Sequence, residues 1–135
     1  MKIPEDTQNF HYHNENPKGK HTTDCVIRAI AVATNTSWET TLSNLTALAM
    51  KHSQMPIDKN LYAKYLASLG WDKHAQPRKH SGKKFTAAEF AQVLKGRPAI
   101  AHVGGHHMSF LNENKVWDTW DCSGRCVGNY WIKLT

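Results

Sequence analysis

The chain has 135 residues and a formal net charge of +6 at pH 7, from 17 Lys and Arg against 11 Asp and Glu. This length is typical of a single domain that buries a core without help from disulfides. Three cysteines are too few for a disulfide framework, and no apolar run approaches the length of a membrane span. We therefore expect a cytoplasmic protein that does not enter membranes.

Residues 1–21 are polar and contain many turn-forming residues, such as Asn-Glu-Asn-Pro-Lys-Gly at 14–19. We expect a mostly extended N-terminal arm here. No composition shift or internal repeat divides the remaining residues, so 22–135 are predicted to form one domain.

The segment Thr22-Thr23-Asp24 runs directly into an apolar stretch, and each of its three residues is a candidate N-cap. Arg28 is the lone charge of that stretch, so a helix buried on nearly every face is predicted up to Thr34. Cys25 falls in its first turn, where the helix dipole favours a thiolate. We interpret Cys25 as a nucleophile; the alternative is a buried, unreactive cysteine.

Helical spacing and capping residues predict three more helices, and Thr86 with Glu89 forms the capping box of the last. Their expected ranges are 37–52, 59–70 and 86–95. Loops with one short strand are expected over 71–84. Strands are predicted at 99–103, 107–111, 115–120 and 127–132. Because the helices precede the strands, we expect an α+β fold in which N-terminal helices pack on a C-terminal antiparallel sheet.

The turn at residues 113–114 predicts a hairpin whose two-residue loop sets the pairing of the strands on either side. That register places His107 opposite Trp120, with Asp118 one diagonal step away on the same face. A loop with an odd number of residues would bring His106 to that face instead.

Cys25, His107 and Asp118 together meet the needs of thiol catalysis. A thiol nucleophile requires a base that accepts its proton, and the base requires an acceptor that fixes its orientation. The sequence supplies these groups in the order Cys, His, Asp. We therefore predict a catalytic triad.

This order, with the cysteine opening a buried helix, resembles the papain-like cysteine protease superfamily. Asp118-Thr119-Trp120 is similar to the Asn-Ser-Trp of that superfamily, whose tryptophan screens the histidine from water. The resemblance extends to small, uncharacterised bacterial and phage-encoded members through the segments 24–30, 70–71, 76–79 and 118–122, and it covers roughly residues 15–132. It implies a minimal papain-like domain with Cys25 as nucleophile, His107 as base, Asp118 as orienting acid and Trp120 as screen.

The chain departs from the superfamily at the oxyanion hole. The usual glutamine, six residues before the cysteine, is Gly19 here. A second oxyanion donor is therefore expected from Asn16, His21 or a backbone N–H beside that of Cys25. Losing one such donor typically lowers the rate by about 10²–10³. Asp24 is expected to act as the N-cap, with a supporting influence on the cysteine.

The resemblance implies a thiol hydrolase, either a cysteine peptidase or an amidase or isopeptidase, that works through a thioester and needs no cofactor. An acyltransferase, transglutaminase or deamidase could use the same triad. A different class is a non-catalytic phage or bacterial binding protein or inhibitor on this fold.

The partner we expect is a protein or peptide, and the positive charge favours an acidic one. Nucleic acid is not expected but stays open, since the basic runs at 18–20 and 78–84 are typical of solvated loops.

A zinc site is the remaining alternative. Cys122 and Cys126 could combine with His102, His106 or His107. Their spacing, C-x₃-C, lacks a second well-spaced ligand pair, so we expect no metal and a packing or turn role for both cysteines.

Overall fold

A computed structural model describes residues 2–134, and within that range four helices pack on one six-stranded sheet. The helices are α1 (Cys25–Thr34), α2 (Trp38–His52), α3 (Lys59–Ser68) and α4 (Ala87–Val93). The strands are β1 (Phe10–Tyr12), β2 (Trp71–His74), β3 (Ala99–Val103), β4 (His107–Asn112), β5 (Lys115–Asp118) and β6 (Val127–Lys133). The predicted α+β class is confirmed.

The sheet differs from the antiparallel C-terminal sheet that the sequence predicts. Its strand order is β1-β5-β4-β3-β6-β2, and β1 runs parallel to β5 while the other neighbours are antiparallel. The sheet is therefore mixed, and both edge strands come from outside the C-terminal region. The N-terminal arm supplies β1, which is short and polar apart from the fully buried Phe10, so its sequence carries little strand signal.

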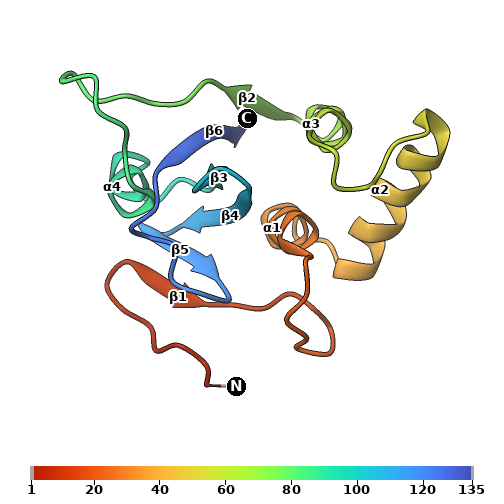
Figure 1. Cartoon of the computed structure of the whole chain (residues 1–135), viewed down its shortest axis with the longest axis horizontal. Coiled ribbons are helices and arrows are strands. Elements are labelled where there is room, and N and C mark those ends of the chain that lie inside the picture. The colour runs from red at the N-terminus through yellow and green to blue at the C-terminus, as the bar shows by residue number, and fades with distance from the viewer. Residues whose placement is uncertain (1, 135) are drawn as a thin grey trace.

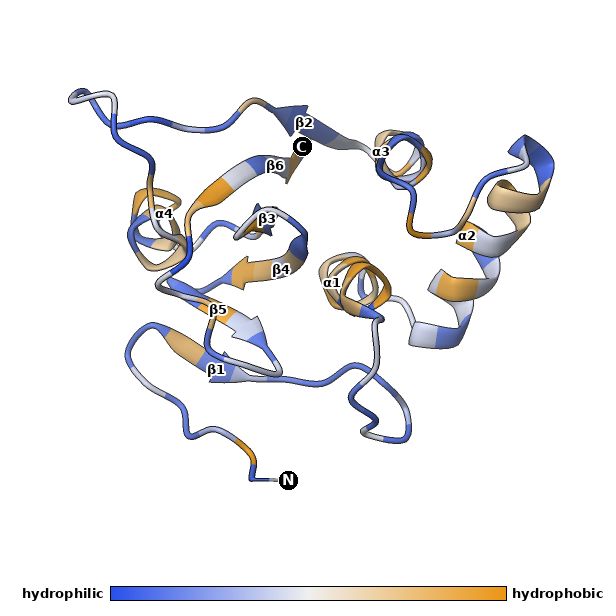
Figure 2. Ribbon diagram, in the orientation of Figure 1, coloured by the Kyte–Doolittle hydropathy of each residue, from blue (hydrophilic) through white to orange (hydrophobic). Residues whose placement is uncertain are grey.

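Helices cover both faces of the sheet (Figure 1). α1 packs against β4 and β3, with α2 and α3 beyond it, while α4 lies on the opposite side against β5. In Figure 2 the hydrophobic colour lies on α1 and on parts of β4, β5 and β6, and Val116 of β5 and Val127 of β6 belong to the cluster on the α4 side of the sheet. Burial of Ile27 and Ile30 on α1 against Ile100, Met108 and Trp131 of the sheet fixes this helix on the sheet.

The side chains of Ser37 and Thr86 cap the helices that they precede, whereas that of Asp24 does not. The Ser37 side chain accepts from the backbone N–H of Thr40, and Thr86 with Glu89 forms the predicted capping box. Asp24 occupies the N-cap position of α1, but its side chain makes no capping hydrogen bond. Its carboxylate is directed elsewhere, and the prediction of a side-chain cap is wrong for this helix.

The β4–β5 hairpin has the predicted register. Glu113 and Asn114 form its two-residue loop at φ 51° and 67°, the left-handed conformation that suits a tight hairpin. Phe110 pairs with Trp117 and Asn112 with Lys115, as an even loop requires. β5 ends at Asp118, so the expected pairing beyond that residue is not part of the sheet ladder.

Within residues 2–134, no helix combines the length and the apolar character that crossing a membrane requires.

Candidate active site

Cys25 is the first residue of α1, and the start of this helix lies against β4. Its side chain is half-buried, which raises the pKa of a thiol. A hydrogen bond with His107, a second with the backbone of Met108, and the charges of His107 and Arg28 outweigh that burial and lower the pKa of Cys25. These contacts therefore favour the thiolate more than water does.

His107 opens β4 and connects the thiol to a buried carboxylate. Its Nε2 lies 2.6 Å from Oδ2 of Asp118, which is 2% exposed at the end of β5. Burial opposes a charged imidazole, but the hydrogen bonds to Asp118, Cys122 and Cys25 raise the pKa of His107 to about 11. Of the predicted triad residues, His107 thus interacts with both Cys25 and Asp118, and it is the histidine that contacts Asp118.

Both carboxylate oxygens of Asp118 accept hydrogen bonds. Its Oδ2 also accepts from Ser109 Oγ at 2.7 Å, and its Oδ1 accepts from Arg28 Nη1 at 3.0 Å and from the backbone N–H of Thr119 at 2.7 Å. Burial raises the pKa of this carboxyl, but the hydrogen bond and charge of His107, together with Ser109 and Arg28, lower it below its usual value. The carboxylate therefore stays charged and fixes the imidazole in orientation.

Arg28 joins Asp118 to a second buried carboxylate. Its Nε donates to Asp24 Oδ1 at 2.8 Å, and the guanidinium is almost fully buried. Oδ2 of Asp24 accepts from Asn16 Nδ2 at 3.1 Å and from the indole N–H of Trp38 at 3.0 Å. The Asp24 carboxylate is occupied by this network, which explains why it does not cap α1.

This network assigns Asn16 a role that differs from the expected one. Its amide nitrogen donates to Asp24, and its side-chain oxygen accepts from the backbone N–H groups of Lys18 and Lys20. Asn16 therefore anchors the arm to α1 rather than facing the reaction space. The sequence contains no short-range signal for this contact, because the partners lie eight residues apart in irregular chain.

A cavity of about 570 Å³ opens beside Cys25. Three parts of the chain line it. The segment before α1 and the start of that helix contribute His21, Thr22, Thr23, Cys25, Val26 and Arg28, and α3 with the segment before it contributes Ile57, Lys59 and Tyr62. The strand ends and loops contribute His102, Gly105, His106, His107, Thr119 and Trp120. His21, one of the expected oxyanion donors, thus faces the cavity, whereas His106 lines it without contacting Asp118.

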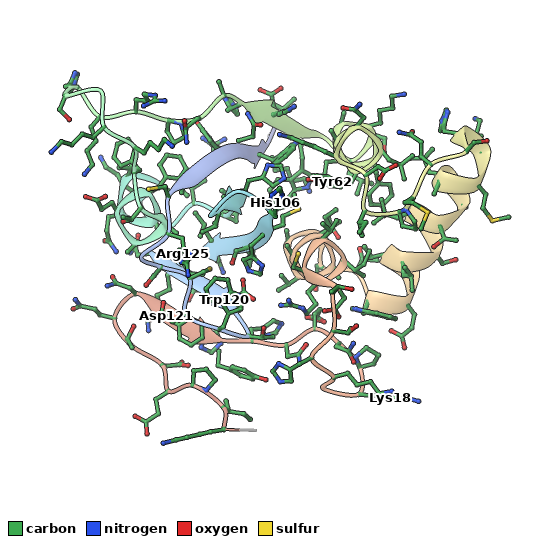
Figure 3. All side chains as sticks on the ribbon, in the orientation of Figure 1. Lys18, Tyr62, His106, Trp120, Asp121 and Arg125 are labelled. Carbon is green, nitrogen blue, oxygen red and sulfur yellow. The ribbon has the colours of Figure 1, made fainter. Side chains whose placement is uncertain are left out.

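Trp120 lies over the triad histidine. Its ring centroid is 4.9 Å from that of His107, and the guanidinium carbon of Arg125 lies over the Trp120 ring at 5.8 Å from its centroid. Trp120 is 38% exposed, so it is a cover rather than a core residue. Figure 3 shows Trp120 and Arg125 close together near β5, with Tyr62 beside α3.

Tyr62 and His102 form a polar pair in the cavity wall that sequence reasoning missed. The Tyr62 hydroxyl donates to Nε2 of His102. Burial, then the charges of Lys59 and Lys73, lowers the pKa of His102 to about 4, which makes it a neutral acceptor. Burial and the negative charge of Cys25 raise the pKa of Tyr62 to about 12, so the hydroxyl keeps its proton.

Cys122 also joins the site. Its buried thiol lies 3.7 Å from Ser109 Oγ and 3.8 Å from Asp118 Oδ2, and burial raises its pKa. Donor atoms of His107, Asp118 and Cys122 lie within 4.8 Å of one another, the only such ligand group among residues 2–134. The guanidinium of Arg28 on the same carboxylate would repel a cation there, so the set fits a hydrogen-bonded cluster better than a metal site.

The cysteines do not combine as the zinc alternative requires. Cys126 is exposed, whereas Cys122 is buried beside the triad. The spacing of the two cysteines in the sequence could not reveal this difference in burial, because the difference depends on the path of the loop between β5 and β6.

Comparison of this chain with protein-family models, with curated proteins and with solved structures found no match in any of the three.

Proposed function

We propose that this protein is a papain-like thiol hydrolase that cleaves amide or isopeptide bonds through a thioester on Cys25. The observation that carries the proposal is the continuous contact from Cys25 through His107 to Asp118 at the mouth of a cavity. The papain-like assignment is supported by the order of the three residues and by the cysteine at the start of a helix that packs on the strand carrying the histidine.

The lowered pKa of Cys25 and the raised pKa of His107 both shift the pair toward thiolate and imidazolium. The thiolate attacks the substrate carbonyl carbon and forms a C–S bond. The imidazolium then gives its proton to the leaving amine as the C–N bond breaks. Neutral His107 next takes a proton from water, whose oxygen attacks the thioester. The C–S bond breaks, which releases the acid and restores the Cys25 thiolate beside the His107 imidazolium. Asp118 stays ionised throughout and holds the ring in position.

The developing oxyanion needs donors beside the sulfur. The backbone N–H of Cys25 is available because the first N–H groups of a helix have no intrahelical acceptor. His21 supplies a further donor from the cavity wall, whereas the one hydroxyl proton of Tyr62 is donated to His102. Its place in the cavity makes His21 a better candidate for the second donor than Asn16, which is bonded to Asp24.

The rate of alkylation of Cys25 by iodoacetamide between pH 4 and 9 tests the proposal. The modified residue is mapped by mass spectrometry, and N-acetylcysteine is the reference thiol. We expect half-maximal reactivity well below pH ~8.5, the value of an ordinary cysteine. The His107→Gln variant should move this midpoint upward, because it removes the largest stabiliser of the thiolate.

A Cys25 that alkylates with the pH dependence of N-acetylcysteine would exclude the hydrolase and favour a binding protein. If the thiolate is activated, cell extracts treated with wild type and with Cys25→Ala identify the bonds that are cut. New protein termini indicate a hydrolase, whereas amine-linked products or Gln-to-Glu conversion indicate the acyl-transfer or deamidase chemistry of the same triad.

A further inference from the structure

A second hollow borders the cavity beside Cys25. The second hollow has a volume of about 280 Å³ and shares Lys59, His102 and Gly105 with the first. Its other walls come from Gln76, Lys84, Gly104, Cys126, Gly128 and Asn129. The shared residues form a path that leads from the sulfur toward Lys84.

Positive charge along this path is not balanced within the protein. No Asp or Glu lines either hollow among residues 2–134. Lys59 Nζ donates to Oδ1 of Asn129 at 2.7 Å, a neutral amide that positions the ammonium without neutralising it. Within the part of the chain that the structure describes, no carboxylate lies within ion-pair distance of Lys59 or Lys84, whereas Lys79 is paired with Glu89.

The walls nearer the sulfur are apolar. Val26 and Tyr62 form the floor beside Cys25, and Ile57 is 52% exposed at the rim. An apolar wall next to one ammonium group suits a side chain that has a short aliphatic part and a carboxylate at its end. A nucleic-acid strand would instead need cations in series along its phosphates.

We propose that Lys59 selects a peptide substrate that carries Asp or Glu next to the amide bond attacked by Cys25. The acidic side chain would lie along the apolar wall, with its carboxylate bonded to the Lys59 ammonium and Lys84 adding attraction further along. This inference rests on the proposed hydrolase for the reaction, but the charge preference of the cavity can be measured without turnover.

The first experiment compares the alkylation of Cys25 by anionic iodoacetate and by neutral iodoacetamide, each relative to N-acetylcysteine. Lys59→Gln should lower the iodoacetate-to-iodoacetamide rate ratio about two- to fivefold, the range for one partly exposed ion pair. Lys59→Arg should retain the wild-type ratio. Lys64→Gln, which removes a charge from the same helix outside both hollows, is the matched control and should also retain it.

The second experiment uses a library of blocked peptides whose cleavage sites are read by mass spectrometry. Wild type should cut peptides next to Asp or Glu faster than the matching peptides that contain Gln. This preference should be about two- to fivefold smaller in Lys59→Gln. An unchanged iodoacetate ratio in Lys59→Gln, with Cys25 still activated, would overturn this inference and leave the hydrolase standing.

A shifted iodoacetate ratio without any peptide cleavage would instead count against the hydrolase while supporting an anion-selective cavity. Binding of a 20-nucleotide oligo(dT) at 150 mM salt that is lost in Lys59→Gln, together with an unchanged iodoacetate ratio, would replace the peptide by nucleic acid.

Discussion

Replacing Arg28 by Met tests the network that supports the triad. The guanidinium donates to Asp24 at 2.8 Å and to Asp118 at 3.0 Å, and the two carboxylates are only 5% and 2% exposed. Met fills a similar volume but has no donor. The variant therefore keeps most of the packing and leaves two buried carboxylates without their shared cation.

Breaking a buried ion pair by removing one partner typically costs about 3–5 kcal/mol. We expect Arg28→Met to lie at the upper part of this range, because two carboxylates lose the same partner. A domain of this size has a total unfolding free energy of about 7–20 kcal/mol, so the loss is a large fraction of it. The melting temperature should fall by about 10–20 °C.

Urea unfolding followed by far-UV circular dichroism measures this free energy. Arg97→Met, at an exposed arginine, is the matched control and should cost less than about 1 kcal/mol. Adding Asp24→Asn to Arg28→Met should cost less than the sum of the single changes, by about 0.5–3 kcal/mol. If Arg28→Met lowers the unfolding free energy no more than the control does, the Arg28 network does not stabilise the protein as argued and the reasoning is refuted.

Two further predictions concern the hairpin and its histidine. In a Cys25→Ala background, the hydrogen bonds to Asp118 and Cys122 still raise the pKa of His107, so His107 should contribute stability fully below pH ~6.5 and lose it as pH rises toward this raised pKa. The measurement is the difference between the unfolding free energies of Cys25→Ala and Cys25→Ala/His107→Gln. This difference should fall between pH 7 and 10, by up to about 1.4 kcal/mol per pH unit. A difference that does not change with pH would contradict the raised pKa of His107. Glu113→Asn should stabilise the protein by about 0.5 kcal/mol in urea, because Asn tolerates the φ of 51° at this turn position better than Glu; a loss of stability would argue against this turn.

Local sequence signals were sufficient for the triad because they fix the hairpin. A two-residue turn at Glu113 and Asn114 determines which residues of β4 and β5 share a face, so the contact between His107 and Asp118 follows from strand alternation alone. Likewise, the apolar run after Asp24 predicts a buried helix that begins at Cys25.

Local signals could not predict what surrounds the triad. The bond from Arg28 to Asp118 joins residues 90 positions apart, and no short-range pattern in the sequence specifies it. Asp24 has the sequence signature of an N-cap, but its carboxylate accepts from Arg28 one helical turn away. It also accepts from Asn16 and Trp38, which tertiary packing brings to it, and these bonds replace capping. The same applies to β1, whose strand is defined by its partner β5 rather than by its own sequence.

Periodicity, capping and turn chemistry act within a few residues, so they predict the helices, the hairpin register and the contact between His107 and Asp118. The mixed sheet, the bond from Arg28 to Asp118, the Tyr62–His102 pair and the lysines that line the two hollows depend instead on tertiary packing. Burial and charge interactions act between residues that are close in space. Where such residues are far apart along the chain, they form no short-range sequence pattern.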